Sequence, residues 1–242
     1  MRKIQFKNGG SLTLKNEASA ATLYFFGDIV SGEMDAWSSE DRYPSDVVNL
    51  LAEIGEVDCL EIHINSGGGD VFAGVAIYNL LKNAKAKQRI CYIDGIAASI
   101  ASVIAMSCDQ IIMRKGSEIM IHNPFCLCLG GAEELRKNAD LLDMIKDQMV
   151  DIYLDRANEG IGSAEISELM DAESWLTPLE AIDVFKNVKL DTSDAEMAAS
   201  SDFTKYYKNH EIPPAPEAVP DPEQEEDSTA ERLRLEIELL SL

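Results

Sequence analysis

The stretch that decides the fold runs from residue 59 to residue 106 and reads CLEIHINSGGGDVFAGVAIYNLLKNAKAKQRICYIDGIAASIASVIAM. Two apolar, β-rich runs, at 59–65 and 88–93, are each followed by a segment of helical character, at 71–83 and 97–106. A glycine turn at 66–70 divides the first pair, and Gly95 is expected to break the chain within the second. Strands that alternate with helices predict an α/β fold with parallel pairing and right-handed crossovers.

The same pattern continues on both sides of this stretch. Alternating runs around the turn Asn8-Gly9-Gly10 predict a hairpin over 1–20. A strand at 21–26 and a helix at 47–54, capped by Ser45 and Asp46, are expected to follow. Further strands are predicted at 110–113, 119–122, 175–176 and 187–190, and helices at 132–158, 163–170 and 178–185. The segment 21–190 therefore reads as one domain.

The composition changes after about Asp191. Residues 191–227 are rich in Asp, Glu, Ala, Ser and Pro, and this predicts a disordered acidic linker. Residues 228–242 open with the capping box of Ser228 and Glu231 and end in ERLRLEIELLSL. The leucines of this C-terminal segment fit no single helical face, so a partner-binding helix and an added strand both stay open.

The composition of the whole chain excludes several classes of protein. The formal charge of −22 disfavours binding to nucleic acid or to an anionic membrane. The N-terminus MRKIQFKNGG has no apolar core of a signal peptide, and no apolar run is long enough for a membrane span. The five cysteines include no CxxC pair, and Cys126 and Cys128 lack further ligands for a metal ion. We expect a cytoplasmic protein with reduced cysteines and without a metal or cofactor.

The chain has only three histidines, which narrows the search for a catalytic base. His63 lies inside a predicted strand, where a structural histidine is the simpler interpretation. His210 lies in the acidic tail and is expected to be solvated. His122 ends a strand, and the Asn123-Pro124 that follows favours a turn, so its imidazole could point into a cleft.

Ser99 lies at a predicted strand-to-helix junction, in the sequence GIAAS (95–99). Small residues around a serine can simply indicate tight helix packing. The junction also offers chemistry, because backbone N–H groups at a helix N-terminus are unpaired and attract negative charge. Ile100 would supply one such donor to an oxyanion. The glycine turn 66–70 could supply a second, since glycine lets the main chain approach a ligand closely.

Taken in order, these motifs resemble the Clp protease proteolytic subunit family. The segment INSGGG (64–69) is similar to the family's INSPGG loop, GIAAS (95–99) to its GxAAS nucleophile motif, and MIHNP (120–124) to its MIHxP motif. The resemblance covers about residues 22–190. It implies a crotonase-like superhelix of ββα units with a projecting handle helix, for which 132–158 is the candidate. It also implies a homo-oligomeric ring that acts on protein substrates.

The resemblance assigns a role to each site residue. Ser99 would be the nucleophile, His122 its base, and the N–H groups of Gly69 and Ile100 the oxyanion hole. The acid would be Glu173, by its distance from Trp175-Leu176, or Asp171, which has the family's usual side chain. The residues expected beside the substrate, which could bind as an added strand, are Gly67, Gly68, Asp70, Val71 and Phe125.

The chain departs from the family pattern at Gly67, where proline is usual, and at its N-terminus, which lacks the loops that dock an unfoldase. The core, the segment DAESW (171–175) and the long acidic tail together resemble the Clp-like head maturation proteases of tailed phages and prophages. This subgroup implies an ATP-independent serine endopeptidase that cleaves scaffold and capsid protein in the assembling prohead.

Three other functions are compatible with parts of the sequence. The first is a housekeeping chambered peptidase fed by an ATP-dependent unfoldase. The second is an acyl-CoA hydratase or isomerase of the crotonase fold, which would not need the pair Ser99 and His122. The third is an assembly or scaffold protein with a vestigial site, against which the complete set of serine, histidine and acid argues.

Overall fold

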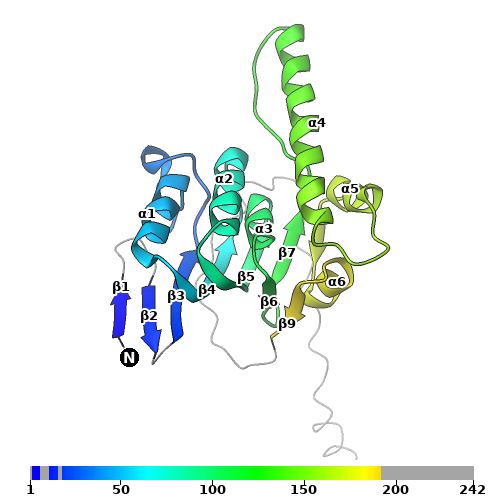
Figure 1. The fold of residues 1–242 in the computed structure, drawn as a ribbon. Helices are drawn as coiled ribbons and strands as arrows, with labels where there is room; N and C mark the ends of the chain where they lie inside the picture. Colours follow the sequence, from blue (N-terminus) through cyan, green and yellow to red (C-terminus); the bar gives the residue numbers. More distant parts are fainter. Residues whose placement is uncertain (1, 6–10, 16–17, 192–242) are drawn as a thin grey trace, which may run out of the picture. The chain divides into compact units, whose positions relative to one another are not determined.

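The computed structural model describes residues 2–5, 11–15 and 18–191, which form the α/β fold that the sequence predicts (Figure 1). Five strands of the sheet run parallel in the order β3, β4, β5, β6, β9. They are β3 (Ala18–Phe25), β4 (Val57–Ser66), β5 (Ala86–Ala98), β6 (Gln110–Met113) and β9 (Val188–Leu190). The strands β1 (Arg2–Gln5) and β2 (Ser11–Lys15) pair antiparallel with each other, and β2 extends the sheet beyond β3.

A small branch of the sheet, formed by β7 (Glu118–Ile121) and β8 (Ser174–Leu176), starts at the end of β5 and positions Ser99 and His122. Ile96, Ala97 and Ala98 pair in parallel with β7, and β7 pairs antiparallel with β8. The strand β5 therefore pairs with β6 through residues 90–93 and with β7 through its last three residues.

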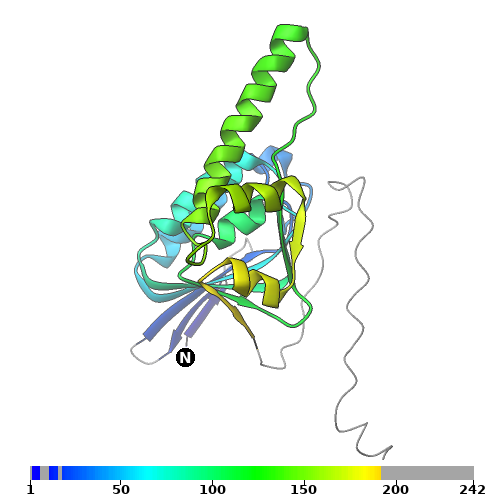
Figure 2. The same ribbon diagram turned by 90° about the vertical axis from the view of Figure 1, so that its right-hand side faces the viewer.

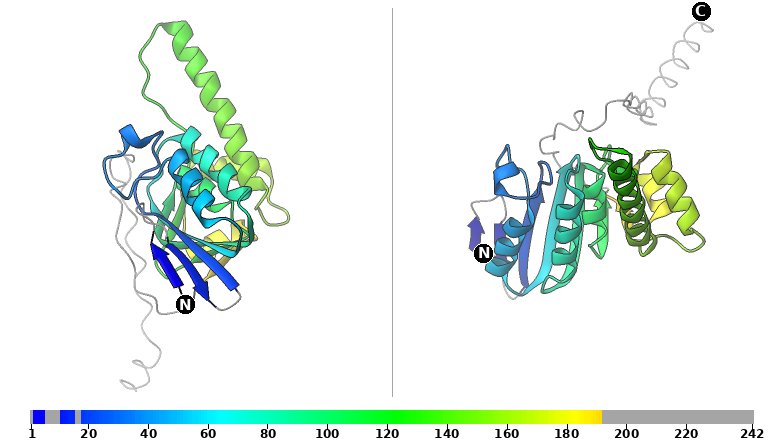
Figure 3. Two further views of the ribbon diagram at one scale, coloured as in Figure 1. Left: turned by 60° about the vertical axis from the view of Figure 1, so that its left-hand side comes forward. Right: turned by 90° about the horizontal axis from the view of Figure 1, so that it is seen from above.

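Three helices cover one face of the sheet, as the two views of Figure 3 show: α1 (Pro44–Ile54), α2 (Val71–Lys82) and α3 (Ile100–Ala105). Asp70 caps α2, because its Oδ1 accepts a hydrogen bond of 2.7 Å from the N–H of Ala73. The side chains between the helices and the sheet, such as Ile62, Ile77 and Ile104, are fully buried. This core fixes the ends of β4 and β5, where the motifs of the sequence lie.

The long helix α4 (Ala132–Leu154) projects from this body (Figure 2). Its buried residues, Ile145, Met149, Val150 and Tyr153, all lie in its second half, whereas Leu135 is 44% and Met144 50% exposed. The helix has the position predicted for a handle and ends four residues earlier than expected. Two short helices follow it, α5 (Ser163–Asp171) and α6 (Pro178–Val184).

The predicted break at Gly95 is wrong, because β5 continues through it to Ala98. A Cβ atom at Gly95 would lie 2.4 Å from Oδ1 of Asn65, and this same oxygen accepts a hydrogen bond of 3.2 Å from the N–H of Ile96. The pairing of β4 with β5 shifts register at this point. Gly95 is therefore the place where a side chain from the neighbouring strand enters the sheet, and α3 begins only at Ile100.

The predicted cap of α1 is also wrong. The helix begins at Pro44, whose fixed φ suits the first helical position, and Tyr43 occupies the cap position. Asp46 is 2% exposed and lies 3.9 Å from Nε of the buried Arg42. The side chain of Asp46 thus contacts Arg42 in the loop before the helix and does not cap the helix N-terminus.

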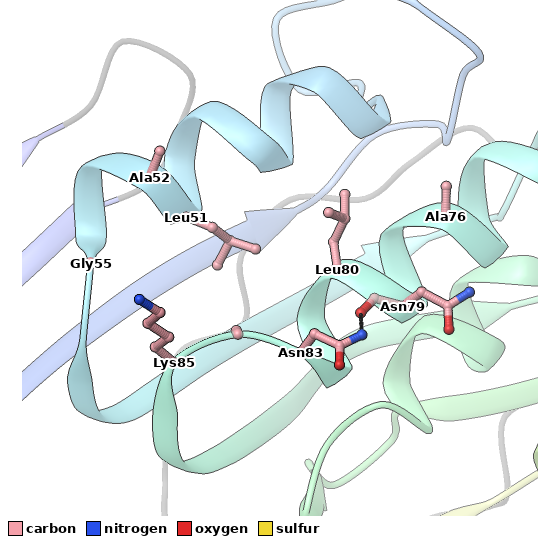
Figure 4. A pocket seen from close by; sticks show the side chains of 9 residues that line it. Leu51, Ala52, Gly55, Ala76, Asn79, Leu80, Asn83 and Lys85 are labelled. Carbon is pink, nitrogen blue, oxygen red and sulfur yellow. Dashed lines mark hydrogen bonds between the residues drawn. The ribbon is translucent and has the colours of Figure 1, made fainter.

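A cleft of about 630 Å3 lies between α1 and α2 (Figure 4). Leu51 and Leu80 contribute apolar lining, and Asn83, which also lines the cleft, donates a hydrogen bond of 2.8 Å from Nδ2 to the carbonyl oxygen of Asn79. It shares no lining residue with the cleft around Ser99 described below. No helix in the described ranges is long and apolar enough to cross a membrane.

Candidate active site

Ser99 occupies a sharp turn between β5 and α3. Its φ of 55° and ψ of −129° are rare for a residue with a side chain, and the surrounding contacts hold it there. Its N–H donates a 2.9 Å hydrogen bond to the carbonyl oxygen of Met120 in β7. Its own carbonyl oxygen accepts a 2.6 Å bond from Oγ of Ser102, which also lies 2.8 Å from the hydroxyl of Tyr153 in α4. The turn is therefore fixed by β7, α3 and α4 together.

His122 directly follows β7 and meets Ser99 across the branch of the sheet. The pairing of Ala98 with Met120 puts the ends of β5 and β7 beside each other. The distance from His122 Nε2 to Ser99 Oγ is 2.8 Å, and His122 is 7% exposed. The ring of Phe125 stands edge-on to the imidazole at 5.8 Å between centroids. The two residues thus have the hydrogen-bonded geometry of a nucleophile and its base.

The two candidate acids have different surroundings. Oδ1 of Asp171 lies 2.5 Å from Nζ of Lys146 in α4 and 2.8 Å from Nδ2 of Asn123, and its side chain is 54% exposed. The hydrogen bond from Lys146 lowers the pKa of Asp171 most, and the bond from Asn123 lowers it further. Asp171 is thus bound to the handle helix.

Glu173 lies in the turn before β8, with a φ of 51°. The antiparallel register pairs Ile119 with Leu176 and Ile121 with Ser174. One further step along this register brings Glu173 opposite His122. The pairing itself ends at Ser174, so the assignment of Glu173 as the acid stays a prediction.

The glycine turn lies against the turn at Ser99. A Cβ atom at Gly68, where φ is 99°, would lie 2.8 Å from the Cβ of Ser99 and 3.3 Å from the nitrogen of Ile100. Gly69 forms a parallel bridge with Ile29, in which the N–H of Ile29 bonds Gly68 and the N–H of Asp70 bonds Ile29. In such a bridge the N–H of the central residue points to the opposite side. The N–H of Gly69 therefore points away from Ile29.

These elements enclose a cleft of about 570 Å3. Ser99 and His122 line it together with four of the five residues predicted beside the substrate, which are Gly67, Asp70, Val71 and Phe125. Gly69, a predicted oxyanion donor, lines it as well. Gly68 does not line the cleft, because it packs against Ser99. The segment 125–131, which we expected to flank the substrate and offer main-chain partners, forms no strand in the described chain.

The sequence reasoning missed a second wall of the cleft, the loop 28–42 between β3 and α1. Asp28, Asp35 and Trp37 of this loop line the cleft. Asp41 holds the loop through hydrogen bonds from the N–H of Trp37 at 2.8 Å and of Asp28 at 3.0 Å. In the sequence, this segment shows a tryptophan among serines and acidic residues and has no helical or strand periodicity. Such a pattern does not predict that the loop lies beside Ser99.

His63 is placed away from Ser99, as expected for a structural histidine. Its Nδ1 lies 2.6 Å from Oδ2 of Asp94, and its ring stacks between Tyr24 and Tyr92 with centroids 5.1 and 4.8 Å away. Asp94 also accepts a bond from Arg114, and the bonds from His63 and Arg114 outweigh burial and lower the pKa of Asp94. This cluster lies on the sheet and supports its strands.

Comparison with known proteins agrees with this architecture. The family model described as Clp protease matches residues 38–184. A protein of Rhodococcus jostii named ATP-dependent Clp protease proteolytic subunit 3 is 33% identical over 172 residues, 70% of this chain and 83% of its own length. A protein of Synechococcus named ATP-dependent Clp protease proteolytic subunit 1 is 29% identical over 66% of this chain and 78% of its own length.

The fold is also found among solved structures. A ClpP1 variant from Listeria monocytogenes superposes with a TM-score of 0.56 and 24% identity, over 70% of this chain and 89% of that chain. This likeness shows a mixed α/β fold similar to that of ClpP. Together with the family match, which spans more than half of the residues, it leads to one conclusion: the chain belongs to the Clp protease family of serine peptidases.

Proposed function

We propose that the chain is a serine endopeptidase in which Ser99 is the nucleophile and His122 the general base. The observation that carries the proposal is the 2.8 Å contact between His122 Nε2 and Ser99 Oγ inside a cleft. Nε2 would take the proton of Oγ while Oγ attacks the scissile carbonyl carbon, and the imidazolium would then give this proton to the leaving amine. Water, activated by the same imidazole, would release the acyl group and restore Ser99.

Two backbone donors would stabilise the oxyanion of the tetrahedral intermediate. Ile100 is the first residue of α3, so its N–H has no carbonyl of a preceding helical turn to bond. The N–H of Gly69 points away from Ile29, and Gly69 lines the cleft. The close contact of Gly68 with Ser99 supports a role for both donors at one oxygen.

Glu173 would orient the imidazole and stabilise its cation, as the third member of the triad. The register of β7 and β8 favours it, whereas Asp171 is bound by Lys146 and Asn123. The peptide would bind as an added strand along Gly67–Val71, because the other edge of that segment is already bridged to Ile29.

The substrate we propose is scaffold and capsid protein in the assembling prohead of a phage or prophage, cleaved without ATP by a homo-oligomeric ring in the host cytoplasm. Support comes from the sequence: the segment DAESW (171–175) and the acidic tail resemble that subgroup. Apart from Asp191, the linker 191–227 lies outside the described residues, as does the segment 228–242. The proposed role of the tail is to tether the enzyme at its substrate, which raises the local concentration without altering the site.

The names of the relatives favour a second function. They are proteolytic subunits of ATP-dependent Clp proteases, so this chain could work as a chambered peptidase that receives unfolded protein from an ATPase. A third possibility, an assembly protein with a vestigial site, requires that Ser99 be unreactive.

A fluorophosphonate probe tests the chemistry. The wild-type chain should be labelled at one serine, and Ser99→Ala should abolish labelling and peptide hydrolysis. Ser117→Ala is a matched control, because Ser117 is buried, its Oγ donates a hydrogen bond to the carbonyl oxygen of Arg114, and it does not line the cleft of Ser99. Labelling that survives Ser99→Ala would contradict the assignment, and an unlabelled wild-type chain would favour the vestigial protein.

A comparison of substrates separates the two peptidase functions. The full chain alone should cleave assembled scaffold or capsid protein without nucleotide, and a chain that ends at Leu190 should still fold and hydrolyse a small peptide but fail on the assembled protein. Cleavage of protein only when an unfoldase and ATP are added would favour the chambered peptidase.

A further inference from the structure

The loop 28–42 is a rigid wall of the cleft. Arg42 is 4% exposed, and its guanidinium donates 2.8 Å and 3.0 Å hydrogen bonds to the carbonyl oxygens of Tyr24 and Ser39. Asp41, which is 7% exposed, packs on Gly27 so closely that a Cβ atom there would lie 2.5 Å from its Oδ1. Buried charged groups with several hydrogen bonds are costly to displace, so the loop is held in one shape.

This rigid loop presents a tryptophan to solvent inside the cleft of the nucleophile. Trp37 is 96% exposed, and it lines the same cleft as Ser99 and His122. Its backbone N–H is anchored to Asp41, whereas its indole packs on nothing in the core. An exposed aromatic ring on a fixed backbone offers a large contact area at little entropic cost, which is the property of a binding residue.

The negative charge of the cleft favours a cationic group as the ligand of the indole. Asp28, Asp35 and Asp70 line the cleft, and none of its described lining residues is a lysine or arginine. Asp70 caps α2, so its charge is directed to the helix N-terminus. Asp35 is exposed and lies in the same loop as Trp37, two residues away. A cation held near Asp35 could place its charge over the indole face.

We propose that Trp37, with Asp35 beside it, is a specificity-determining residue that binds a lysine or arginine side chain of the substrate peptide near the scissile bond. The indole contacts the methylene chain and the cationic group, and the carboxylate of Asp35 provides the countercharge. Glutamate at the same substrate position meets an acidic cleft and is rejected. The inference rests on the proposed peptidase function, since the cleft is that of Ser99.

Binding tests this inference without requiring turnover. Three fluorescein-labelled peptides that differ at one position, as arginine, norleucine or glutamate, are titrated into the full chain carrying Ser99→Ala, and the anisotropy gives each Kd. We expect the arginine peptide to bind at least about tenfold more tightly than the glutamate peptide, an effect that weakens with salt. Each peptide position is varied in turn. Equal binding at all positions, or a preference for norleucine, would overturn the proposal.

Variants of the loop assign the effect to Trp37. Trp37→Ala should weaken binding of the arginine peptide about tenfold and leave the Kd of the glutamate peptide unchanged. Trp37→Phe should keep part of the preference for arginine. Met34→Ala is the matched control, because Met34 is 99% exposed in the same loop and does not line the cleft. Asp35→Asn should reduce the preference for arginine over norleucine. A preference that survives Trp37→Ala would overturn the role of Trp37.

The two proposals can fail separately. If the wild-type chain hydrolyses no peptide but the Ser99→Ala chain binds the arginine peptide through Trp37, the peptidase function fails and the cation subsite stands. If the wild-type chain hydrolyses all three peptides with the same kcat/KM at every position, the peptidase function stands and the subsite fails.

Discussion

Gly74 of α2 faces Ile100, the residue directly after Ser99, so closely that a Cβ atom at Gly74 would lie 2.1 Å from Cγ1 of Ile100. Ile100 is fully buried, and its N–H is a proposed oxyanion donor. The packing of α2 on α3 therefore sets the position of the backbone beside the nucleophile.

Gly74→Ala should force Ile100 to move and should destabilise the fold by about 1–3 kcal/mol, as overpacking of a core does. Peptide hydrolysis should fall further than the loss of folded protein explains, because the donor at residue 100 shifts. Urea denaturation and kcat at saturating peptide measure the two effects. Gly162→Ala is the control, since nothing lies within 4 Å of a Cβ atom there. Equal activity per folded molecule would contradict the coupling.

His122→Ala should lower kcat/KM by about 10⁴-fold or more, because the base that activates Ser99 is lost. His63→Ala should keep kcat/KM and lower the free energy of unfolding by about 1–3 kcal/mol, since it leaves buried Asp94 with one hydrogen-bond partner fewer. Steady-state kinetics and denaturation on both variants check this. An inactive but stable His63→Ala chain would show that the base is misassigned.

Glu173→Gln should impair turnover more than Asp171→Asn. The register of β7 with β8 favours Glu173 as the partner of His122, whereas Asp171 is half-exposed and bound to Lys146. The measurement is kcat against pH, because a residue that stabilises the imidazolium also changes the pH profile and a structural residue does not. The reverse ranking would assign the third role to Asp171.

Asp41 should make the fold sensitive to acid. Burial tends to raise its pKa, but hydrogen bonds from the N–H groups of Asp28, Trp37 and Ser38 outweigh this, so the pKa of Asp41 is lowered. A carboxyl group with a lowered pKa stabilises the fold above its unfolded pKa of about 3.9 and loses this contribution as the pH falls through the lower folded value. Asp41→Asn should therefore reduce stability at pH 6 and flatten its decline below about pH 4. Urea midpoints across this range test it, and parallel profiles for both chains would refute it.

The sequence indicated the order of strands and helices correctly because these depend on neighbouring residues. The apolar runs at 59–65 and 88–93 became β4 and β5, and Asp70 and the glycine turn defined the start of α2. The sequence also separated His122 from His63, since a strand end followed by Asn-Pro differs locally from a strand interior. Where it failed, at Gly95, the deciding contact came from Asn65 on the neighbouring strand, which a local pattern does not connect to that position. At α1 the deciding residues are near neighbours, because the helix begins at Pro44 and Asp46 lies beside Arg42.

The sequence by itself determined the family motifs, the succession of elements and the residue types of the candidate site. Only the tertiary structure brought Ser99 Oγ to 2.8 Å from His122 Nε2, bound Asp171 to Lys146, and folded the loop 28–42 into a wall of the cleft with Trp37 exposed on it. The physical reason is that secondary structure follows from interactions between near neighbours. The shape and charge of a cleft depend instead on side chains that are distant along the chain and meet only when the sheet has formed.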